Sequence, residues 1–195
     1  MRIGALIPAA GMSTRMGDFK PLLLLGPATM AERLIATLRG AGADEIVMVT
    51  GFQAERMERV LAGSGVTFIR NGAYAQSDMF ASARLGLSYL VPRCDRILFT
   101  PVDVPLFSPA TVKALLDSEA EIACPTFHGM RGHPLLLSKD AAARLPEDGG
   151  EDGMRGAIAR CGVQVTEVPV IDEGILRDAD TPQDFQRLLE LDGRK

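Results

Sequence analysis

Short apolar runs alternate along the chain with stretches whose apolar residues recur at helical spacing. The apolar runs predict strands over residues 3–7, 45–50, 66–69, 95–100, 122–124, 135–137 and 163–168. The helical spacing predicts helices over residues 29–38, 53–61, 81–90, 140–145 and 181–191, and one that begins at Ser108. This alternation is typical of an α/β, Rossmann-like fold, in which helices cover both faces of a mostly parallel sheet.

Length and composition restrict the class of protein. A chain of 195 residues has the size of one domain, or of one domain with a small lobe. The hydrophobic fraction of 47% and the charged fraction of 24% are those of an ordinary globular protein, which excludes a mostly disordered chain. The net charge of −4, without a block of basic residues, argues against a nucleic-acid partner.

The apolar runs are too short to cross a bilayer, so we predict no membrane partner. Cys94, Cys124 and Cys161 are an odd number of widely separated cysteines without metal-ligand spacing. We therefore predict reduced thiols in a cytoplasmic protein.

The loop after the first predicted strand carries the strongest candidate chemistry, because ligands of such sheets bind beyond the carboxyl ends of the strands. Residues 8–20 read P-A-A-G-M-S-T-R-M-G-D-F-K. Small residues let backbone N–H groups approach an anion, Arg15 can hold phosphate oxygens bidentately, and Lys20 supplies a point charge. The glycine spacing matches neither the dinucleotide fingerprint nor the P-loop. A structural turn with solvated cations is the alternative.

This loop and the residues around it resemble a known signature. The run I-P-A-A-G-M-S-T-R-M-G-D-F-K-P-L is similar to the A-A-G-x-[ST]-x-R-M-G-x-x-K-x-L motif of nucleotidyltransferases with a glycosyltransferase-A-like sheet, and in particular of the molybdenum cofactor nucleotidyltransferase branch. The resemblance implies that Arg15 and Lys20 are catalytic and act on a triphosphate. It also implies nucleotide contacts from the residues of the loop, namely Pro8, Ala9, Ala10, Gly11 and Ser13.

Two aspartates are candidate metal ligands. Asp103 follows a buried strand in L-F-T-P-V-D-V-P and resembles the family's catalytic, metal-binding aspartate, although a turn or capping aspartate also fits this position. Asp180 lies in R-D-A-D-T-P-Q-D-F, which resembles the family's D-[IV]-[DN]-T-P-[EQ]-D-[LF] segment, with helix capping as the alternative. The resemblance implies a second metal carboxylate here, for which Asp180 is preferred to Asp178. One or two carboxylates with phosphate oxygens and water suit Mg²⁺, the implied cofactor.

Two further motifs resemble nucleotide-contacting segments of the family. Asn71 begins N-G-A-Y, similar to N-x-x-[YW], and Ser82 lies in M-F-A-S-A-R-L-G-L, similar to G-M-x-x-S-[LIV]-x-x-G-L. The resemblance implies nucleotide contacts from both side chains. An ordinary turn and an ordinary first-turn serine are the alternatives. Asp78 stands where the family has a glycine, a departure that alters this loop.

Two residues are candidate contacts to the acceptor. His133 lies in R-G-H-P, which resembles a G-[HN]-P turn of the same branch, and Arg155 lies in G-G-E-D-G-M-R-G, which resembles its G-D-x-G-x-R loop. The resemblance implies that they bind the second substrate. A turn histidine and a solvated loop arginine are the alternatives.

The implied reaction is Mg²⁺-dependent nucleotidyl transfer, in which an acceptor phosphate oxygen attacks the α-phosphorus of a nucleoside triphosphate and releases pyrophosphate. The acceptor needs no general base, because the second pKa of a phosphate is ~6. Within the family, the pair Ala9-Ala10 favours CTP over GTP, and we expect molybdopterin as acceptor. Sugar phosphates and polyol phosphates are the alternative acceptors.

We expect residues 1–195 to form a single nucleotidyltransferase domain, with a nucleotide-binding part over about 1–105 and an acceptor-facing part over about 106–180. Two other hypotheses remain. The chain is a nucleotide-binding module without turnover, for which the departure at Asp78 is the only support, or it is a fragment of a larger protein. As further partners, the resemblance allows a molybdoenzyme-maturation protein or a second domain outside this chain.

Overall fold

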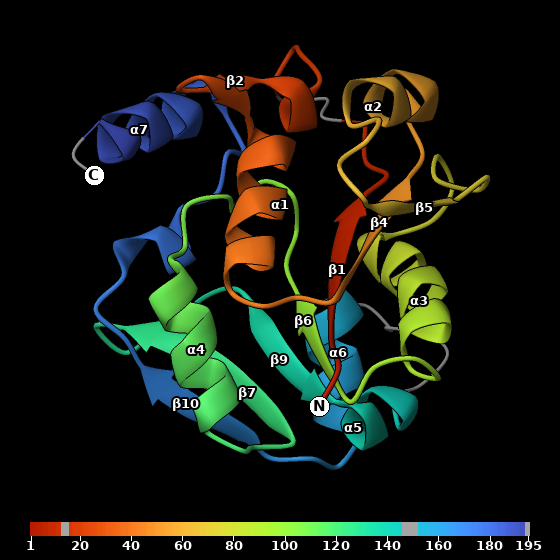
Figure 1. The fold of residues 1–195 in the computed structure, drawn as a ribbon, viewed down its shortest axis with the longest axis vertical. Coiled ribbons are helices and arrows are strands. Elements are labelled where there is room, and N and C mark those ends of the chain that lie inside the picture. The colour runs from red at the N-terminus through yellow and green to blue at the C-terminus, as the bar shows by residue number, and fades with distance from the viewer. Residues whose placement is uncertain (13–15, 146–151, 194–195) are drawn as a thin grey trace.

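The computed structural model describes residues 1–12, 16–145 and 152–193 (Figure 1). Its main sheet has the strand order β10-β7-β9-β6-β1-β4-β5, and β8 pairs with β7 outside this path. The strands of this sheet are β1 (Ile3–Ala9), β4 (Glu45–Thr50), β5 (Thr67–Arg70), β6 (Arg96–Phe99), β7 (Ile122–Phe127), β8 (Met130–Arg131), β9 (Leu135–Ser138) and β10 (Val165–Pro169).

The direction of the strands confirms the predicted, mostly parallel α/β sheet. Strand β1 is parallel to both β4 and β6, β4 is parallel to β5, and β10 is parallel to β7. Strand β9 runs antiparallel between β6 and β7, with Leu98 opposite Leu136. The carboxyl ends of β1 and β6 therefore meet at one edge of the sheet, and β9 separates them from β7 and β10.

Helices cover both faces of the sheet, as predicted. The helices are α1 (Met30–Gly40), α2 (Ala54–Val60), α3 (Met79–Leu90), α4 (Pro109–Asp117), α5 (Lys139–Ala143), α6 (Gly153–Arg160) and α7 (Pro182–Asp192). Alternate residues of β1 point to opposite faces. Ala5 and Ile7 join the buried cluster that contains residues of α1, α2 and α4, and Leu6 joins the cluster that contains residues of α3, α5 and α6. Figure 1 shows α1 and α4 on the near face.

The predicted helix starts at Ser108 and Thr181 are confirmed. The Ser108 hydroxyl accepts a hydrogen bond from the N–H of Thr111, and Pro109 is the first residue of α4. Thr181 and Asp184 form a reciprocal capping box at the start of α7. Both caps satisfy N–H groups that the helix itself leaves without a partner.

Several elements were not predicted. The prediction of a loop at Arg155 is wrong, because residues 153–160 form the helix α6, in which Met154, Ala157 and Ile158 are buried against α3 and the sheet. A short hairpin, β2 (Leu24–Leu25) and β3 (Ala28–Thr29), follows Lys20. Another is the 3-10 turn η3 (Glu173–Leu176) before α7.

The C-terminal helix packs on the hairpin that follows Lys20. Leu188 of α7 shares a buried cluster with Leu25 and Met30, and Asp192 pairs with Arg33 of α1. This packing fixes the segment before α7 against the segment before the hairpin.

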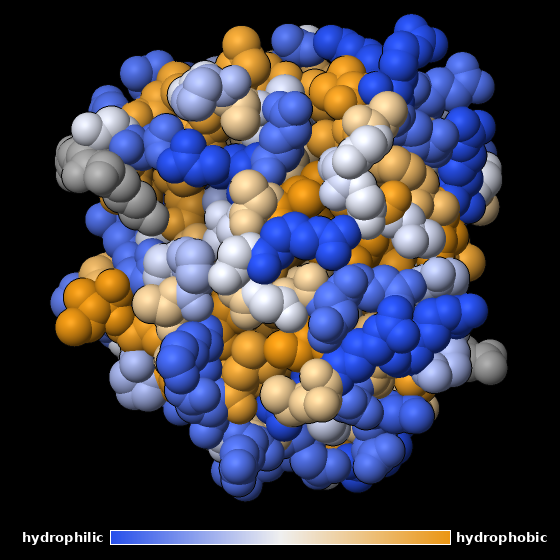
Figure 2. Space-filling view, viewed as in Figure 1, coloured by the Kyte–Doolittle hydropathy of each residue, from blue (hydrophilic) through white to orange (hydrophobic). Residues whose placement is uncertain are grey.

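The side of the molecule that carries α1 and α4 has a mixed surface, on which hydrophilic residues surround smaller apolar areas (Figure 2). Within the described residues, no helix combines the length and the apolarity needed to span a membrane. The thiols of Cys94, Cys124 and Cys161 are free.

Candidate active site

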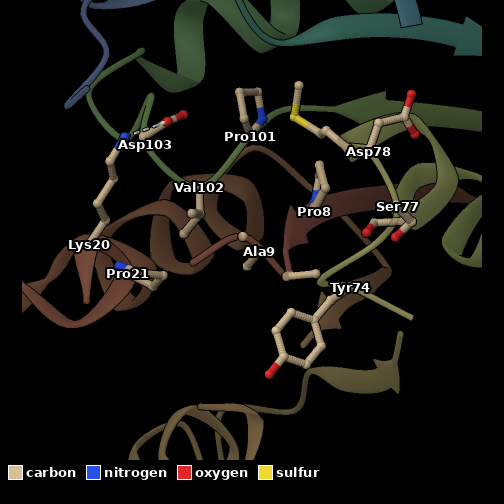
Figure 3. Close-up of a pocket in the computed structure, with 14 residues that line it drawn as sticks. Pro8, Ala9, Lys20, Pro21, Tyr74, Ser77, Asp78, Pro101, Val102 and Asp103 are labelled. Atoms are coloured by element: carbon tan, nitrogen blue, oxygen red, sulfur yellow. Dashed lines mark ion pairs between the residues drawn. The ribbon is translucent and has the colours of Figure 1, made fainter. Parts of the chain in front are cut away.

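A cavity of about 190 Å³ lies at the carboxyl ends of β1 and β6 (Figure 3). Its walls come from the loop after β1, the segment before α3 and the loop after β6. It is lined by Pro8, Ala9, Ala10, Gly11, Lys20, Pro21, Tyr74, Ser77, Asp78, Met79, Ser82, Pro101, Val102 and Asp103. This is the edge of the sheet at which the sequence predicts the site.

The floor of the cavity is built from small residues that are held by the segment after β4. The N–H of Phe52 donates to the carbonyl of Ala10 at 3.1 Å. Gly51 allows this contact, because a Cβ at that position would lie 2.8 Å from the oxygen of Ala10. The small side chains of Ala9, Ala10 and Gly11 therefore leave the floor open to a ligand.

Lys20 lies between two carboxylates. It begins a 3-10 turn, η1 (Lys20–Leu22), in which Pro21 follows it at once. The Nζ atom of Lys20 is 2.7 Å from Oδ1 of Asp180 and 3.5 Å from Oδ2 of Asp103. Its side chain is only 12% exposed. A single, largely buried ammonium thus joins η1 to the segments after β6 and before α7.

Asp103 is held rigidly beside this ammonium. Its carbonyl accepts a hydrogen bond from the N–H of Ala179 at 3.1 Å, which ties the loop after β6 to the segment that carries Asp180. Burial raises the pKa of Asp103, the charge of Lys20 opposes this shift, and the charges of Asp180 and Asp178 raise the pKa further. The site therefore favours additional positive charge next to Asp103.

The carboxylates fit a divalent cation that is held jointly with a triphosphate. Within residues 1–12, 16–145 and 152–193, no group of three or more His, Cys, Asp or Glu side chains gathers as a complete metal site. Asp103 and Asp180, however, both contact the same ammonium, so they face one common position. Two carboxylates completed by phosphate oxygens and water are a ligand set that Mg²⁺ accepts.

The segment before α3 is organised around Asn71, which is 6% exposed. Its Nδ2 donates to Oγ of Ser77 at 2.9 Å and to Oγ of Ser82 at 3.0 Å. Its Oδ1 accepts from the N–H of Ala73 at 3.0 Å, which confirms the predicted turn. Ser82 lines the cavity, but Asn71 is not among the residues that line it. A direct contact between Asn71 and a nucleotide stays a prediction.

Asp78, where the family motif has glycine, caps α3. Its carboxylate accepts a hydrogen bond from the N–H of Ala81 at 2.7 Å. An aspartate at this position satisfies an N–H group at the start of the helix and interacts favourably with the helix dipole. The departure from the motif therefore keeps the start of α3, and with it Ser82, in place.

A second cavity of about 900 Å³ adjoins the first, because Asp78 and Met79 line both. Most of its wall is apolar, and Arg131, His133 and Arg155 add polar groups. Its other lining residues are Phe80, Phe99, Ile122, Cys124, Gly132, Leu135, Asp152, Gly153, Met154, Ile158, Ala159, Val163 and Val165. The structure therefore places the predicted acceptor contacts, His133 and Arg155, in one cavity.

His133 is held neutral. Burial lowers the pKa of its imidazole to about 4, against the opposing effect of a hydrogen bond to the backbone of Phe99. Its Nδ1 is buried and has no hydrogen-bond partner within the described part of the chain. Protonation of this ring would place a charge in an apolar wall.

We expect the protein to lose stability between pH 6.5 and about pH 4 because of His133. An unfolded chain binds a proton at this histidine below pH 6.5, whereas the folded chain does not until about pH 4, so the stabilisation is complete above pH 6.5 and falls on acidification. The loss is on the order of 3 kcal/mol. Urea unfolding across this pH range measures the free energy of unfolding.

The substitution His133→Asn should flatten the slope of the free energy of unfolding against pH. The substitution His128→Asn, at an exposed histidine, is the control and should leave the slope unchanged. Equal slopes in the parent protein and both variants would contradict the expectation.

The structure brings most predicted site residues together. Asp180 joins the first cavity through Lys20, and the predicted residues that line this cavity are Pro8, Ala9, Ala10, Gly11, Lys20, Ser82 and Asp103. Ser13 and Arg15 lie outside the described residues. The prediction omitted Tyr74 and Ser77, of which Tyr74 occupies the last position of the N-x-x-[YW] motif.

A small-residue loop, a lysine and two carboxylates lie together at the carboxyl edge of an open α/β sheet. This arrangement suits nucleotidyl transfer, because such catalysis depends on positioning phosphates and neutralising their charge. Residues 5–165 match the model of the MobA-like NTP transferase domain. The chain belongs to this family.

Known proteins resemble the chain over nearly its whole length. Molybdenum cofactor cytidylyltransferase of Escherichia coli K12 is 27% identical over 185 residues, which are 94% of this chain and 93% of the relative. The nucleotidyl transferase Mth528 of Methanothermobacter has a similar fold, with a TM-score of 0.87 at 24% identity over 99% of this chain and 98% of its own. Rv0371c of Mycobacterium tuberculosis H37Rv, solved in complex with manganese, has a TM-score of 0.80 at 27% identity and covers 97% of this chain and 99% of its own. A relative of this fold thus binds a divalent metal.

Proposed function

We propose that this protein transfers CMP from CTP to a phosphorylated acceptor, molybdopterin, and releases pyrophosphate, with Mg²⁺ held by Asp103 and Asp180. The observation that carries the proposal is the position of Lys20, whose ammonium contacts both carboxylates beside the small-residue loop. The likeness to the cytidylyltransferase of Escherichia coli supports the choice of nucleotide and acceptor.

The chain's own residues act by positioning and by charge. Backbone N–H groups of the loop after β1 face the triphosphate, and Lys20 neutralises the negative charge that develops on the departing pyrophosphate. The acceptor phosphate is ionised near pH 7, because its second pKa is ~6, and it attacks the α-phosphorus without a dedicated base. A divalent ion, when bound, supplies further charge neutralisation at the phosphate oxygens.

The second cavity supports a bulky acceptor. Its volume of about 900 Å³ and its largely apolar wall suit a fused heterocyclic body better than a small, highly hydroxylated sugar phosphate. Arg155 offers positive charge to an acceptor phosphate, and His133 contributes a neutral ring. The guanidinium of Arg131 also lines the cavity and pairs with Glu167 at 2.8 Å. The nucleotide-binding part then covers about residues 1–105 and the acceptor-facing part about 106–180 of one domain. Free thiols at Cys94, Cys124 and Cys161 support a cytoplasmic setting.

A screen of pyrophosphate release tests this function. CTP, GTP, ATP and UTP are each combined with molybdopterin, sugar phosphates or polyol phosphates in the presence of Mg²⁺. We expect the highest kcat/KM for CTP with molybdopterin. Turnover of another pair would replace the proposed substrates, and binding of a triphosphate without turnover of any pair would favour a regulatory module.

A further inference from the structure

The 3-10 turn η3 contacts the walls of both cavities. On one side Gly174 packs on the loop after β6, where a Cβ would lie 2.1 Å from the carbonyl oxygen of Leu106. On the other side the carbonyl of Ile175 accepts a hydrogen bond from the N–H of His133 at 2.9 Å. The loop after β6 carries Asp103 of the first cavity, and His133 lines the second. The position of η3 therefore relates one wall to the other.

A buried carboxylate that the mechanism does not use holds η3 in place. Asp172 precedes η3 and is 8% exposed. Its Oδ1 accepts from the N–H of Gly174 at 3.1 Å. Its Oδ2 accepts from the N–H of Ser108 at 2.7 Å and from the hydroxyl of Thr111 at 2.6 Å, at the start of α4. One side chain thus links η3 to the end of the loop after β6.

The contacts on either side of this link are made by backbone atoms. A Cβ at Gly132 would lie 2.4 Å from the carbonyl oxygen of Ile175, so the turn that carries His133 lies directly on η3. The N–H of Ala179, beyond η3, donates to the carbonyl of Asp103 at 3.1 Å. Since no long side chain lies between these groups, a displacement of η3 passes directly to the turn at His133.

Nucleotidyl transfer is sensitive to such a displacement. The acceptor oxygen must lie in line with the α-phosphorus, at ~3–3.5 Å, and a misplacement of ~1 Å can reduce the rate ~100-fold. The nucleotide and the acceptor occupy different cavities, which share Asp78 and Met79. The relative position of the two walls therefore affects the transfer step more than the binding of the nucleotide.

We propose that Asp172 is a positioning residue for the transfer, because it fixes, through η3, the position of the acceptor cavity relative to the nucleotide cavity. The inference rests on the proposed function. Asp172 is not among the residues that line either cavity, so it acts through η3 and touches neither substrate. Its removal should therefore lower kcat and leave the affinity for CTP unchanged.

The substitution Asp172→Asn breaks this link without changing the size of the side chain. An amide has one accepting oxygen and one donating nitrogen. The backbone N–H groups of Ser108 and Gly174 donate to different oxygens of Asp172. In either orientation the amide turns its nitrogen toward one of these N–H groups. One of the two backbone tethers is therefore lost.

Thr111→Val is the matched control. It removes the hydroxyl that donates to Oδ2 of Asp172, but both backbone tethers remain. This variant should lose stability through the same buried carboxylate while η3 stays in position. It separates a loss of stability from a loss of alignment.

Steady-state pyrophosphate release and calorimetry with CTP and Mg²⁺, without acceptor, separate the transfer step from nucleotide binding. We expect Asp172→Asn to lower kcat with CTP and molybdopterin by about tenfold or more, and to leave the dissociation constant of CTP unchanged. Thr111→Val should leave both quantities unchanged. Thermal unfolding identifies variants that do not fold.

Nuclear magnetic resonance detects the link without substrates. The chain has two histidines, so labelling with ¹⁵N-histidine gives two backbone amide signals. Asp172→Asn should shift the signal of His133, whose N–H donates to Ile175, and Thr111→Val should not. The signal of His128, at the exposed end of the β7–β8 hairpin, is the internal reference.

The outcomes separate this inference from the proposed function. A His133 signal that does not move in Asp172→Asn, or equal kcat values in Asp172→Asn and Thr111→Val, would overturn the positioning role and leave nucleotidyl transfer intact. A parent protein without turnover would overturn the proposed function, and with it the role in transfer, whatever the signal of His133 does. If Asp172→Asn does not fold, Gly174→Ala decides the question, because its methyl group would displace η3 from Leu106.

Discussion

Replacing Lys20 by alanine should lower kcat/KM for nucleotidyl transfer at least about a hundredfold, which corresponds to about 3 kcal/mol of transition-state stabilisation. The ammonium lies 2.7 Å from Asp180 and 3.5 Å from Asp103 and is 12% exposed, so water cannot readily replace it. Its removal leaves two carboxylates facing the triphosphate without the cation that offsets them. Steady-state pyrophosphate release with CTP and Mg²⁺ measures the loss.

Lys113→Ala is the matched control for this experiment. Lys113 is an exposed lysine of α4 that pairs with Asp117 at 2.8 Å, so its removal should leave kcat/KM unchanged. Lys20→Arg should recover only part of the activity, because a planar guanidinium does not replace a compact ammonium between two carboxylates. A rate for Lys20→Ala within threefold of the parent would contradict the assigned role.

The substitution Asp103→Asn should also reduce kcat/KM by about a hundredfold or more. The amide keeps the size of the side chain, and the bond from the N–H of Ala179 to the backbone carbonyl of residue 103 is unaffected. What is lost is the negative charge of one of the two carboxylates that fit a divalent ion. The effect should therefore include a higher Mg²⁺ concentration at half-maximal rate.

Titration of Mn²⁺ followed by electron paramagnetic resonance measures metal binding independently of turnover. Asp103→Asn should weaken Mn²⁺ binding in the presence of CTP, and Asp117→Asn, on the exposed face of α4, should not. Metal binding that is unaltered in Asp103→Asn, together with a normal rate, would remove Asp103 from the site.

Most of the predicted site residues that the structure brings together follow the ends of strands. Lys20 and Asp103 each follow a strand that is buried on both faces and that pairs in parallel with its neighbour. Such strands read as continuous apolar runs, and their carboxyl ends meet at one edge. The positions of Lys20 and Asp103 after such strands therefore sufficed to predict that these distant residues lie at the same edge of the sheet. The prediction of Asp180 as a site residue also required the family motif, because Asp180-Thr181-Pro182 is equally typical of a helix start.

The sequence did not predict the partners of the Asn71 side chain. Asn71-Gly72 predicts a turn, and the turn is present. The partners of the amide, Ser77 and Ser82, come from the following segment and from the first turn of α3. The packing of α3 against β1 and β4 places the first turn of this helix beside Asn71. This packing requires Gly86, where a Cβ would lie 2.1 Å from Cδ1 of Leu6.

The helix α6 was missed because its composition is that of a loop. Gly153 and Gly156 lower the helix propensity of a short segment. Gly156 is nevertheless buried, and the segment contacts α3 closely, so tertiary packing outweighs propensity here. The sequence also did not predict the antiparallel direction of β9. The short run over residues 135–138 has the same apolar character in either direction.

The contact between Lys20 and Asp180 joins residues that are 160 positions apart. At ~5–20 residues per second, a ribosome adds the second of them roughly 10 to 30 s after the first. During that interval Asp103 is synthesised, but Asp180, the nearer of the two carboxylates, is not. The complete site for a triphosphate therefore forms only late in translation, when the last helix packs on the hairpin near the beginning of the chain.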